Sequence, residues 1–184
     1  MKKRLFIAIN LPEEVKRQLS PLILELAKLN KRVAIKWVKS ELIHLTLHFL
    51  GYLDQGKEEE VEKILENLCC QYRFATLKSS GLGAFPNLTS PRVIYLATKQ
   101  TSGDDLGSLQ REIGKYLANI GQEPERRAWQ SHLTLGRVKA GGRVKLEPVE
   151  IPELSFKVES IELMESRLSS IGPEYYIVKS FPLG

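Results

Sequence analysis

The chain has 184 residues, of which 42% are hydrophobic and 27% are charged. A globular protein of this size buries enough surface to need no disulfide or metal staples, and no apolar run approaches the length of a membrane span. The formal net charge of +5 favours a polyanionic or phosphate-bearing partner, although the same charge also serves simple solubility.

Apolar periodicity and turn residues predict the elements in chain order. Helical spacing continues past Pro21, which is expected either to kink the first helix or to restart it. A glycine-rich bend is expected near the end of the strand over 74–85. The predicted strands cover 5–9, 34–38, 43–50, 74–85, 92–98, 132–135, 155–165 and 174–180, and the predicted helices cover 13–29, 57–70 and 106–120.

The two cysteines, Cys69 and Cys70, are adjacent in a segment with helical spacing. Neighbours in sequence rarely form a disulfide, and two ligands do not make a zinc site, so we expect reduced thiols. The apolar run over 5–9 is too short for a signal peptide and no small-residue cleavage site follows it. We therefore expect a cytoplasmic protein without a membrane segment.

The tetrapeptide His-Leu-Thr-Leu occurs twice, at 44–47 and at 132–135, 88 positions apart (132 − 44). Residues 4–7 and 92–95 are related by the same interval (92 − 4), and each half runs strand, helix, connection and repeated strand. Coincidence in a leucine-rich sequence is the alternative. Two matched anchors at one offset favour duplication, which predicts pseudo-symmetric halves around a cleft.

The repeated tetrapeptides place histidine and threonine on one face of a strand and leucine on the other. His44 and Thr46 share a face in the first copy, as do His132 and Thr134 in the second. Imidazoles with a pKa near 6.5 can be neutral and protonated at the same pH, which provides a general base and a general acid. Threonine hydroxyls can donate to phosphoryl oxygens, so the two pairs predict a phosphodiester substrate.

A single histidine on a strand is more often structural than catalytic, and the repetition favours catalysis. Alternation puts His48 on the face of His44 and puts Phe49 on the leucine face. His48 has no counterpart, because Gly136 occupies the equivalent position, and we expect it to be structural. The residues around His44 and His48 include no acidic or cysteine cluster, no G-x-S-x-G is present, and 81–85 does not match a nucleotide-binding fingerprint. We expect neither a metal nor a cofactor.

Paired H-x-T-x motifs in strands are typical of the two-histidine phosphoesterase superfamily. The chain resembles, essentially from end to end, the bacterial and archaeal RNA 2′,3′-cyclic phosphodiesterases, which are also called 2′-5′ RNA ligases. The segments that carry the resemblance are RLFIAINLPEEVK, WVKSELIHLTLHFLGYL, GLGAFPN, PRVIYLA, HLTLGRVK and the final FPLG.

The resemblance implies a bilobal α+β fold in which two antiparallel sheets, with helices outside, flank an active-site cleft. It also implies one domain over 1–184 with interleaved lobes. The implied reaction is metal-independent hydrolysis of RNA 2′,3′-cyclic phosphate ends to a 2′-phosphate. We expect a monomer that acts on RNA, with tRNA fragments as a candidate substrate, because some relatives join tRNA halves. ATP-independent 2′-5′ ligation and cleavage of 2′-5′ oligonucleotides are the alternatives within the same class.

The resemblance also assigns roles by position. His44, Thr46, His132 and Thr134 form the catalytic set, with His132 as the base that activates water and His44 as the acid. Arg137 matches a basic residue near the phosphate. Strict alternation puts Arg137 on the leucine face, so it reaches the phosphate only if the strand bulges or ends at Gly136.

The segment before the second motif departs from the family pattern. Relatives often have an aromatic residue, a basic residue and proline there, whereas this chain has Trp129, Gln130 and Ser131. A basic substrate contact is therefore expected either to be missing from this chain or to have moved to Arg126 or Arg127.

Aromatic and basic residues elsewhere are candidates for binding RNA, with core packing or simple solvation as the alternative for each. The aromatic candidates are Phe6, Trp37, Phe85 and Trp129, and the basic candidates are Lys36, Arg92, Arg126 and Arg127. A non-catalytic RNA-binding module is the competing class of function. Arginine and lysine would serve simple phosphate binding better than neutral histidine, which favours an enzyme.

Overall fold

The computed structural model describes residues 1–123, 128–140, 142–170 and 172–184. Its helices are α1 (Glu13–Leu29), α2 (Gln55–Cys69) and α3 (Leu106–Asn119), with a short 3₁₀ helix η1 (Ser40–Leu42). Its strands are β1 (Lys3–Asn10), β2 (Ile35–Trp37), β3 (His44–Leu53), β4 (Ala75–Phe85), β5 (Val93–Gly103), β6 (His132–Val138), β7 (Ser155–Val158), β8 (Ser160–Ser169) and β9 (Gly172–Pro182).

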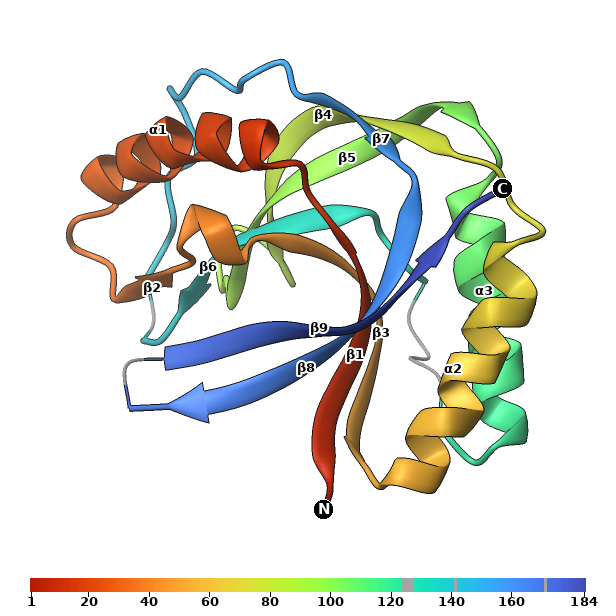
Figure 1. Cartoon of the computed structure of the whole chain (residues 1–184). Helices are drawn as coiled ribbons and strands as arrows, with labels where there is room; N and C mark the ends of the chain where they lie inside the picture. Colours follow the sequence, from red (N-terminus) through yellow and green to blue (C-terminus); the bar gives the residue numbers. More distant parts are fainter. Residues whose placement is uncertain (124–127, 141, 171) are drawn as a thin grey trace.

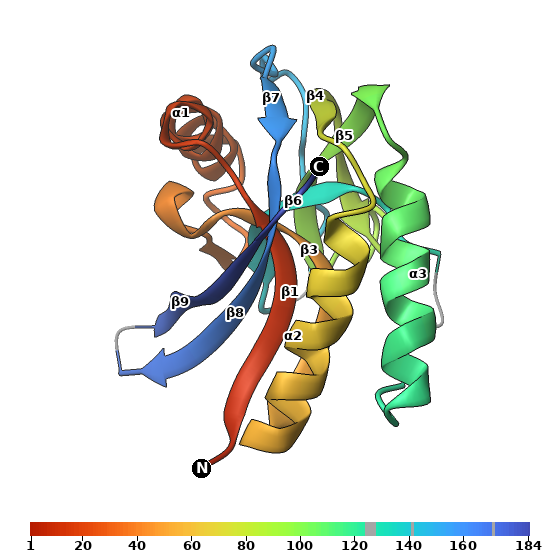
Figure 2. The ribbon, with the colours of Figure 1, turned by 45° about the vertical axis from the view of Figure 1, so that its right-hand side comes forward.

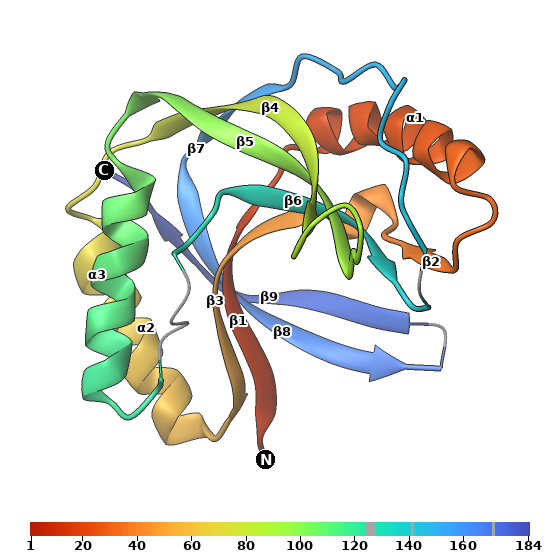
Figure 3. The ribbon, with the colours of Figure 1, turned by 180° about the vertical axis from the view of Figure 1, so that it is seen from behind.

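The strands form two antiparallel sheets, as the α+β prediction required (Figures 1 and 3). The first sheet has the order β3-β1-β8-β9, and the second has the order β2-β6-β5-β4-β7. In each sheet the strand with the repeated tetrapeptide pairs with the strand that opens its half of the chain, β1 with β3 and β5 with β6. The two motif strands are therefore paired in the same way, as pseudo-symmetric halves would require.

The helices lie on opposite sides of this arrangement. Figure 2 shows α2 and α3 side by side and away from α1, which packs beside β2 and η1. The leucines that alternate with the motif residues supply the core, since Leu45 and Leu133 are both 0% exposed. None of the helices in the described ranges combines the length and apolar character of a membrane span.

Three sequence predictions differ from the observed elements. Pro21 lies inside one continuous helix, so the helix does not restart there, whereas a kink at Pro21 stays a prediction. The expected bend near 81–85 is absent from β4, which remains paired with β5 through Phe85 and takes up an extra residue at Ser80. The strand expected over 155–165 is two strands in different sheets, because β7 pairs with β4 whereas β8 pairs with β1.

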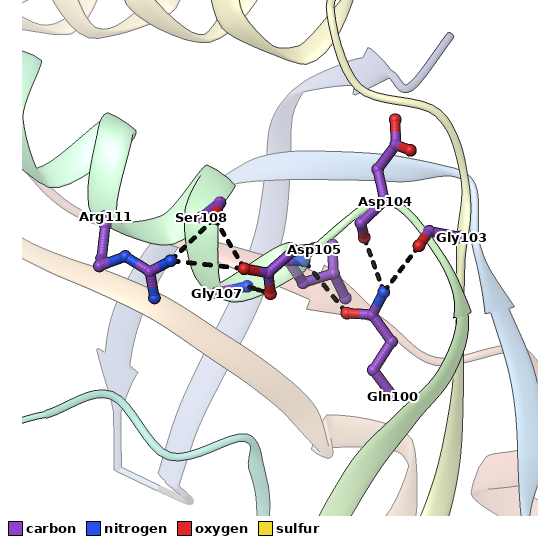
Figure 4. A network of polar contacts seen from close by, with 8 residues as sticks. Gln100, Gly103, Asp104, Asp105, Gly107, Ser108 and Arg111 are labelled. Carbon is purple, nitrogen blue, oxygen red and sulfur yellow. Dashed lines mark hydrogen bonds and ion pairs between the residues drawn. The ribbon is translucent and has the colours of Figure 1, made fainter.

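Helix α3 is anchored to β5 by a polar network at its first turn (Figure 4). The Asp105 carboxylate accepts hydrogen bonds from the Gly107 backbone N–H at 2.9 Å and from the Ser108 hydroxyl at 2.7 Å. Gln100 of β5 accepts from the Leu106 N–H at 3.1 Å. Because an N-cap of this kind satisfies otherwise unpaired donors, it fixes where α3 begins relative to the second sheet.

Candidate active site

Both motif strands carry a β-bulge at the same place in the repeat. In the first sheet Ile7 pairs with His48 and Ala8 pairs with Thr46, which leaves Leu47 as the extra residue. In the second sheet Ile94 pairs with Gly136 and Tyr95 pairs with Thr134, which leaves Leu135 extra. A bulge shifts the alternation of side chains by one residue, so the residues that follow it lie on the opposite face from the one that strict alternation predicts.

The bulge at Leu135 brings Arg137 to the face of His132 and Thr134. Arg137 pairs with Val93, which shares a face with Tyr95 and hence with Thr134. The condition that the sequence set for Arg137 is therefore met. Lys36 pairs with Arg137 from the other side, so two basic side chains lie next to each other on this face. We call the face of the second sheet that carries His132, Thr134 and Arg137 the histidine face.

The bulge at Leu47 reverses the faces predicted for the two residues after it. His48 pairs with Ile7, is only 5% exposed, and its Nε2 lies 2.8 Å from the Gln110 carbonyl oxygen of α3. Phe49 pairs with Phe6 on the face of Thr46 and is 66% exposed. The expected placement of both residues was wrong, while the structural role expected for His48 fits its buried position. Phe49 is thus the counterpart of Arg137 in the repeat.

Each motif histidine is held by a backbone carbonyl two residues before it. The Nδ1 atom of His44 lies 2.9 Å from the Leu42 oxygen, and that of His132 lies 2.7 Å from the Gln130 oxygen. A carbonyl oxygen can only accept, so we assign the proton of each neutral ring to Nδ1. The two Nε2 atoms are then left for proton transfer, as bases in the neutral rings and as acids in the protonated ones.

Two aromatic rings pack against each motif histidine. His44 lies with its ring centroid 4.9 Å from Phe6 and 5.0 Å from Tyr175. His132 lies 5.1 Å from Phe85 and 5.4 Å from Tyr95. These contacts limit rotation of both imidazoles and reduce their access to water. Sequence reasoning missed Tyr95 and Tyr175 as neighbours of the histidines, because their contacts depend on how distant strands pair.

Burial lowers the pKa of both motif histidines below the usual value of 6.5. Desolvation is the largest cause at His44 and at His132, while the hydrogen bond of each Nδ1 opposes it by favouring the protonated ring. The charge of Arg137 lowers the pKa of both rings, and the charges of Lys16 and His132 lower the pKa of His44 further. One basic side chain therefore acts electrostatically on both histidines, which come from different sheets.

The predicted aromatic contacts with a base pack against the protein in the structure. Phe6 is 3% exposed beneath His44. Trp37 pairs with Gly136 on the core side of the second sheet, where a Cβ atom added to Gly136 would meet the indole ring at 2.9 Å. Trp129 donates its Nε1–H to the Thr46 carbonyl oxygen at 3.0 Å. As base-stacking residues all three stay predictions.

The two arginines expected before the second motif, Arg126 and Arg127, lie outside the described residues. Within the described ranges, no three side chains of the types His, Cys, Asp and Glu are grouped so as to hold a metal ion. Cys69 is buried, which raises the pKa of its thiol to about 12 and keeps it protonated. The candidate functional groups of the site are the two imidazoles, the two threonine hydroxyls and Arg137.

Comparison with known proteins finds relatives that match this chain over nearly its whole length. A family model described as LigT like Phosphoesterase matches residues 9–95. The RNA 2′,3′-cyclic phosphodiesterase of Thermotoga maritima is 34% identical over 181 residues, which cover 95% of this chain and 92% of the relative. The protein of the same name from Methanocaldococcus jannaschii is 33% identical over 186 residues, covering 97% of this chain and 99% of the relative.

Solved structures share the fold over nearly their whole length. The crystal structure of TT0787 from Thermus thermophilus has a TM-score of 0.80 and 28% identity, covering 98% of this chain and 97% of the other. E. coli LigT complexed with 3′-AMP has a TM-score of 0.76 and 26% identity, with coverage of 100% and 99%. The resemblance read from the sequence is confirmed, and the chain belongs to the LigT-like phosphoesterases, the enzyme family of the RNA 2′,3′-cyclic phosphodiesterases.

Proposed function

We propose that this chain hydrolyses the 2′,3′-cyclic phosphate at the end of an RNA to a 2′-phosphate, with His44 and His132 as the acid–base pair. One observation carries the proposal. Two imidazoles from different sheets each have Nδ1 held by a carbonyl, and the same arginine lowers the pKa of both. This arrangement suits a reaction at one phosphorus atom in which a base takes a proton from the attacking oxygen and an acid gives a proton to the leaving oxygen.

In the proposed reaction, Nε2 of neutral His132 takes a proton from water while the water oxygen forms a bond to phosphorus. The bond between phosphorus and the 3′ oxygen breaks, and protonated His44 gives its Nε2 proton to that oxygen. The products are a 2′-phosphomonoester and a free 3′-hydroxyl. His44 ends neutral and His132 ends protonated, so exchange of one proton with solvent restores the starting state.

The remaining groups are proposed to stabilise the charge on the phosphoryl oxygens. Thr46 and Thr134 follow their histidines by two residues on the same faces, so their hydroxyls can donate to the non-bridging oxygens. Arg137 adds a charged donor, and charge-assisted hydrogen bonds are the strong ones. Loss of either threonine hydroxyl is expected to cost about 1.5–3 kcal/mol of transition-state stabilisation.

We propose further that the enzyme acts as a cytoplasmic monomer, that residues 1–184 work as one catalytic unit, and that tRNA fragments are among its substrates. A monomeric enzyme with one catalytic unit is supported by the composition of the site, because both motifs, Arg137 and the four aromatic neighbours come from one chain. The unpaired cysteines suit a reducing compartment. The net charge of +5 suits an RNA substrate.

Product analysis on 2′,3′-cyclic nucleotides tests the proposal. Wild type should give the 2′-phosphate, while His44→Ala and His132→Ala should each abolish turnover with unchanged circular dichroism. His48→Gln is a matched control, because His48 lies on the buried face of the same strand. A 3′-phosphate product would reverse the assigned roles, and near-normal turnover in either alanine variant would show that the paired-histidine mechanism is wrong. Adding an RNA with a free 5′-hydroxyl to the same assay would reveal any ligation.

A further inference from the structure

A row of three hydrogen-bond donors crosses the second sheet beyond His132. Lys99 of β5 pairs with Lys78 of β4, and Lys78 pairs with Ser155 of β7. All three residues are exposed. Residues that pair directly in an antiparallel sheet have their side chains on the same face, so the two ammonium groups and the hydroxyl project side by side.

This row lies on the histidine face. Ala97 pairs with His132, and Lys99 follows Ala97 by two residues, about 6.6 Å further along the strand. Alternation keeps Lys99 on the same side as Ala97, whereas Leu96 on the other side is 0% exposed. The row therefore begins one strand across from the motif histidine and extends away from it.

The side chains between His132 and the two lysines are small. Ala97 pairs with Gly81 of β4, and a Cβ atom added to Gly81 would have nothing within 4 Å. Two of the smallest side chains thus separate the candidate active site from the two cations. An extended chain that leaves the site in this direction meets no large side chain from these two positions.

The fold gives no local reason for the two lysines to face each other. Like charges directly opposite each other on neighbouring strands are destabilising. Within residues 1–123, 128–140, 142–170 and 172–184, neither Lys78 nor Lys99 forms an ion pair, whereas Lys157 on β7 has Glu159 at 2.7 Å. A bound polyanion would remove the repulsion, and phosphate groups spaced along a single strand supply charges of that kind.

We infer that Lys78 and Lys99 bind the phosphates of the RNA on the 5′ side of its cyclic phosphate, so that the enzyme prefers an RNA end to a mononucleotide. Ser155 adds a neutral donor at the end of the row. This inference rests on the proposed function, because it concerns the same substrate. It adds a preference for longer RNA substrates. This preference comes from the surface of Lys78 and Lys99, which is separate from the two histidines.

The test compares wild type with the double variant Lys78→Gln/Lys99→Gln. Glutamine keeps most of the side chain and removes the charge. The matched control, Lys63→Gln/Lys115→Gln, makes the same change in net charge at exposed positions on α2 and α3. Binding of a fluorescein-labelled single-stranded octanucleotide RNA that ends in a 2′-phosphate is measured by anisotropy over a series of KCl concentrations.

The slope of log Kd against log salt concentration should become shallower by about 1.4 in the double variant, because each phosphate of a single strand that is no longer neutralised reduces the slope by about 0.7. The ratio of kcat/KM for an octanucleotide cyclic phosphate to that for a mononucleotide cyclic phosphate should fall about tenfold. The control variant should keep the wild-type slope and ratio.

An unchanged slope, an unchanged ratio, or equal changes in the control variant would overturn the inference. If wild type turns over neither cyclic phosphate, the proposed function fails. In that case the slope of log Kd against log salt concentration still tests whether Lys78 and Lys99 bind RNA phosphates. The failure of one proposal can thus be told from the failure of the other.

Discussion

Trp129 donates its indole N–H to the backbone carbonyl of Thr46 at 3.0 Å. The donor lies three residues before the second motif histidine, and the acceptor belongs to the first motif, at the residue that precedes the bulge. Because β3 is the edge strand of its sheet, a side-chain donor to a carbonyl beside the bulge fixes the path of the strand there. The hydrogen bond ties the geometry of one motif to the segment that leads into the other.

Replacing Trp129 by Phe keeps an aromatic ring and removes the donor. We expect the free energy of unfolding to fall by about 1–3 kcal/mol, because a partly buried carbonyl loses its partner. We also expect kcat to fall more than KM rises, because the shifted Thr46 hydroxyl would act mainly in the transition state. Urea unfolding and steady-state kinetics measure the two effects. Trp37→Phe is the control for the urea measurement only, because Trp37 stays a candidate for stacking on a base. Unchanged kcat in a destabilised Trp129→Phe enzyme would limit the indole to a structural role.

Alternation predicted the two buried leucine faces of the motif strands and hence how both histidines point away from the core. It could not predict the bulges at Leu47 and Leu135, because a bulge depends on how a strand pairs with its neighbour and leaves no mark in composition. The positions of His48 and Phe49 were wrong for that reason. The sequence could place Arg137 near the phosphate only on the condition that the strand bulges or ends near Gly136.

Contacts between distant strands were the other part that the sequence could not supply. Tyr175 reaches His44 because β9 pairs with β8 and β8 pairs with β1, a chain of pairings that no local pattern encodes. The motif repeat did predict the similar order of strands in the two sheets. The repeated motif therefore indicated how both motif strands pair, which local propensity alone does not.

Gly136 is required by the close approach of β2. A Cβ atom at this position would lie 2.9 Å from a methyl carbon of Ile35 and 2.9 Å from the Trp37 ring. Gly136→Ala should therefore lower the free energy of unfolding by about 1–3 kcal/mol, the usual cost of overpacking. Gly81→Ala is the matched control, because its new methyl group would meet nothing within 4 Å. Equal unfolding midpoints of the two variants in urea would contradict this account.

Chelators should leave the activity unchanged. The two imidazoles supply the acid and the base, and the two threonines with Arg137 supply the contacts to the phosphoryl oxygens, so the proposed reaction assigns no step to a cation. Turnover should persist after exhaustive treatment with EDTA and should not rise with added magnesium or zinc. Loss of activity that a divalent metal restores would refute the proposed division of roles.

The rate should depend on pH as a bell with its maximum on the acidic side of 6.5. The active form needs one protonated and one neutral imidazole, and kcat/KM reports the pKa values of the free enzyme. Burial lowers the pKa of both His44 and His132, so the two macroscopic values of the pair lie below the ordinary value. Measured on a cyclic mononucleotide, log kcat/KM should fall on both sides. A profile without an acid limb would contradict the requirement for a neutral base.

Removing the charge of Arg137 should move that bell to higher pH. A nearby positive charge disfavours a protonated imidazole, and Arg137 lowers the pKa of both histidines, so Arg137→Gln should raise both values. The rate at the new optimum should still be about tenfold to a hundredfold lower, because a charge-assisted hydrogen bond to the phosphate is worth about 1.5–3 kcal/mol. Arg137→Lys retains the charge and should keep both limbs near their wild-type positions, while losing bidentate contact with the phosphate. Lower rates with an unmoved bell in Arg137→Gln would mean that the guanidinium binds substrate without tuning the histidines.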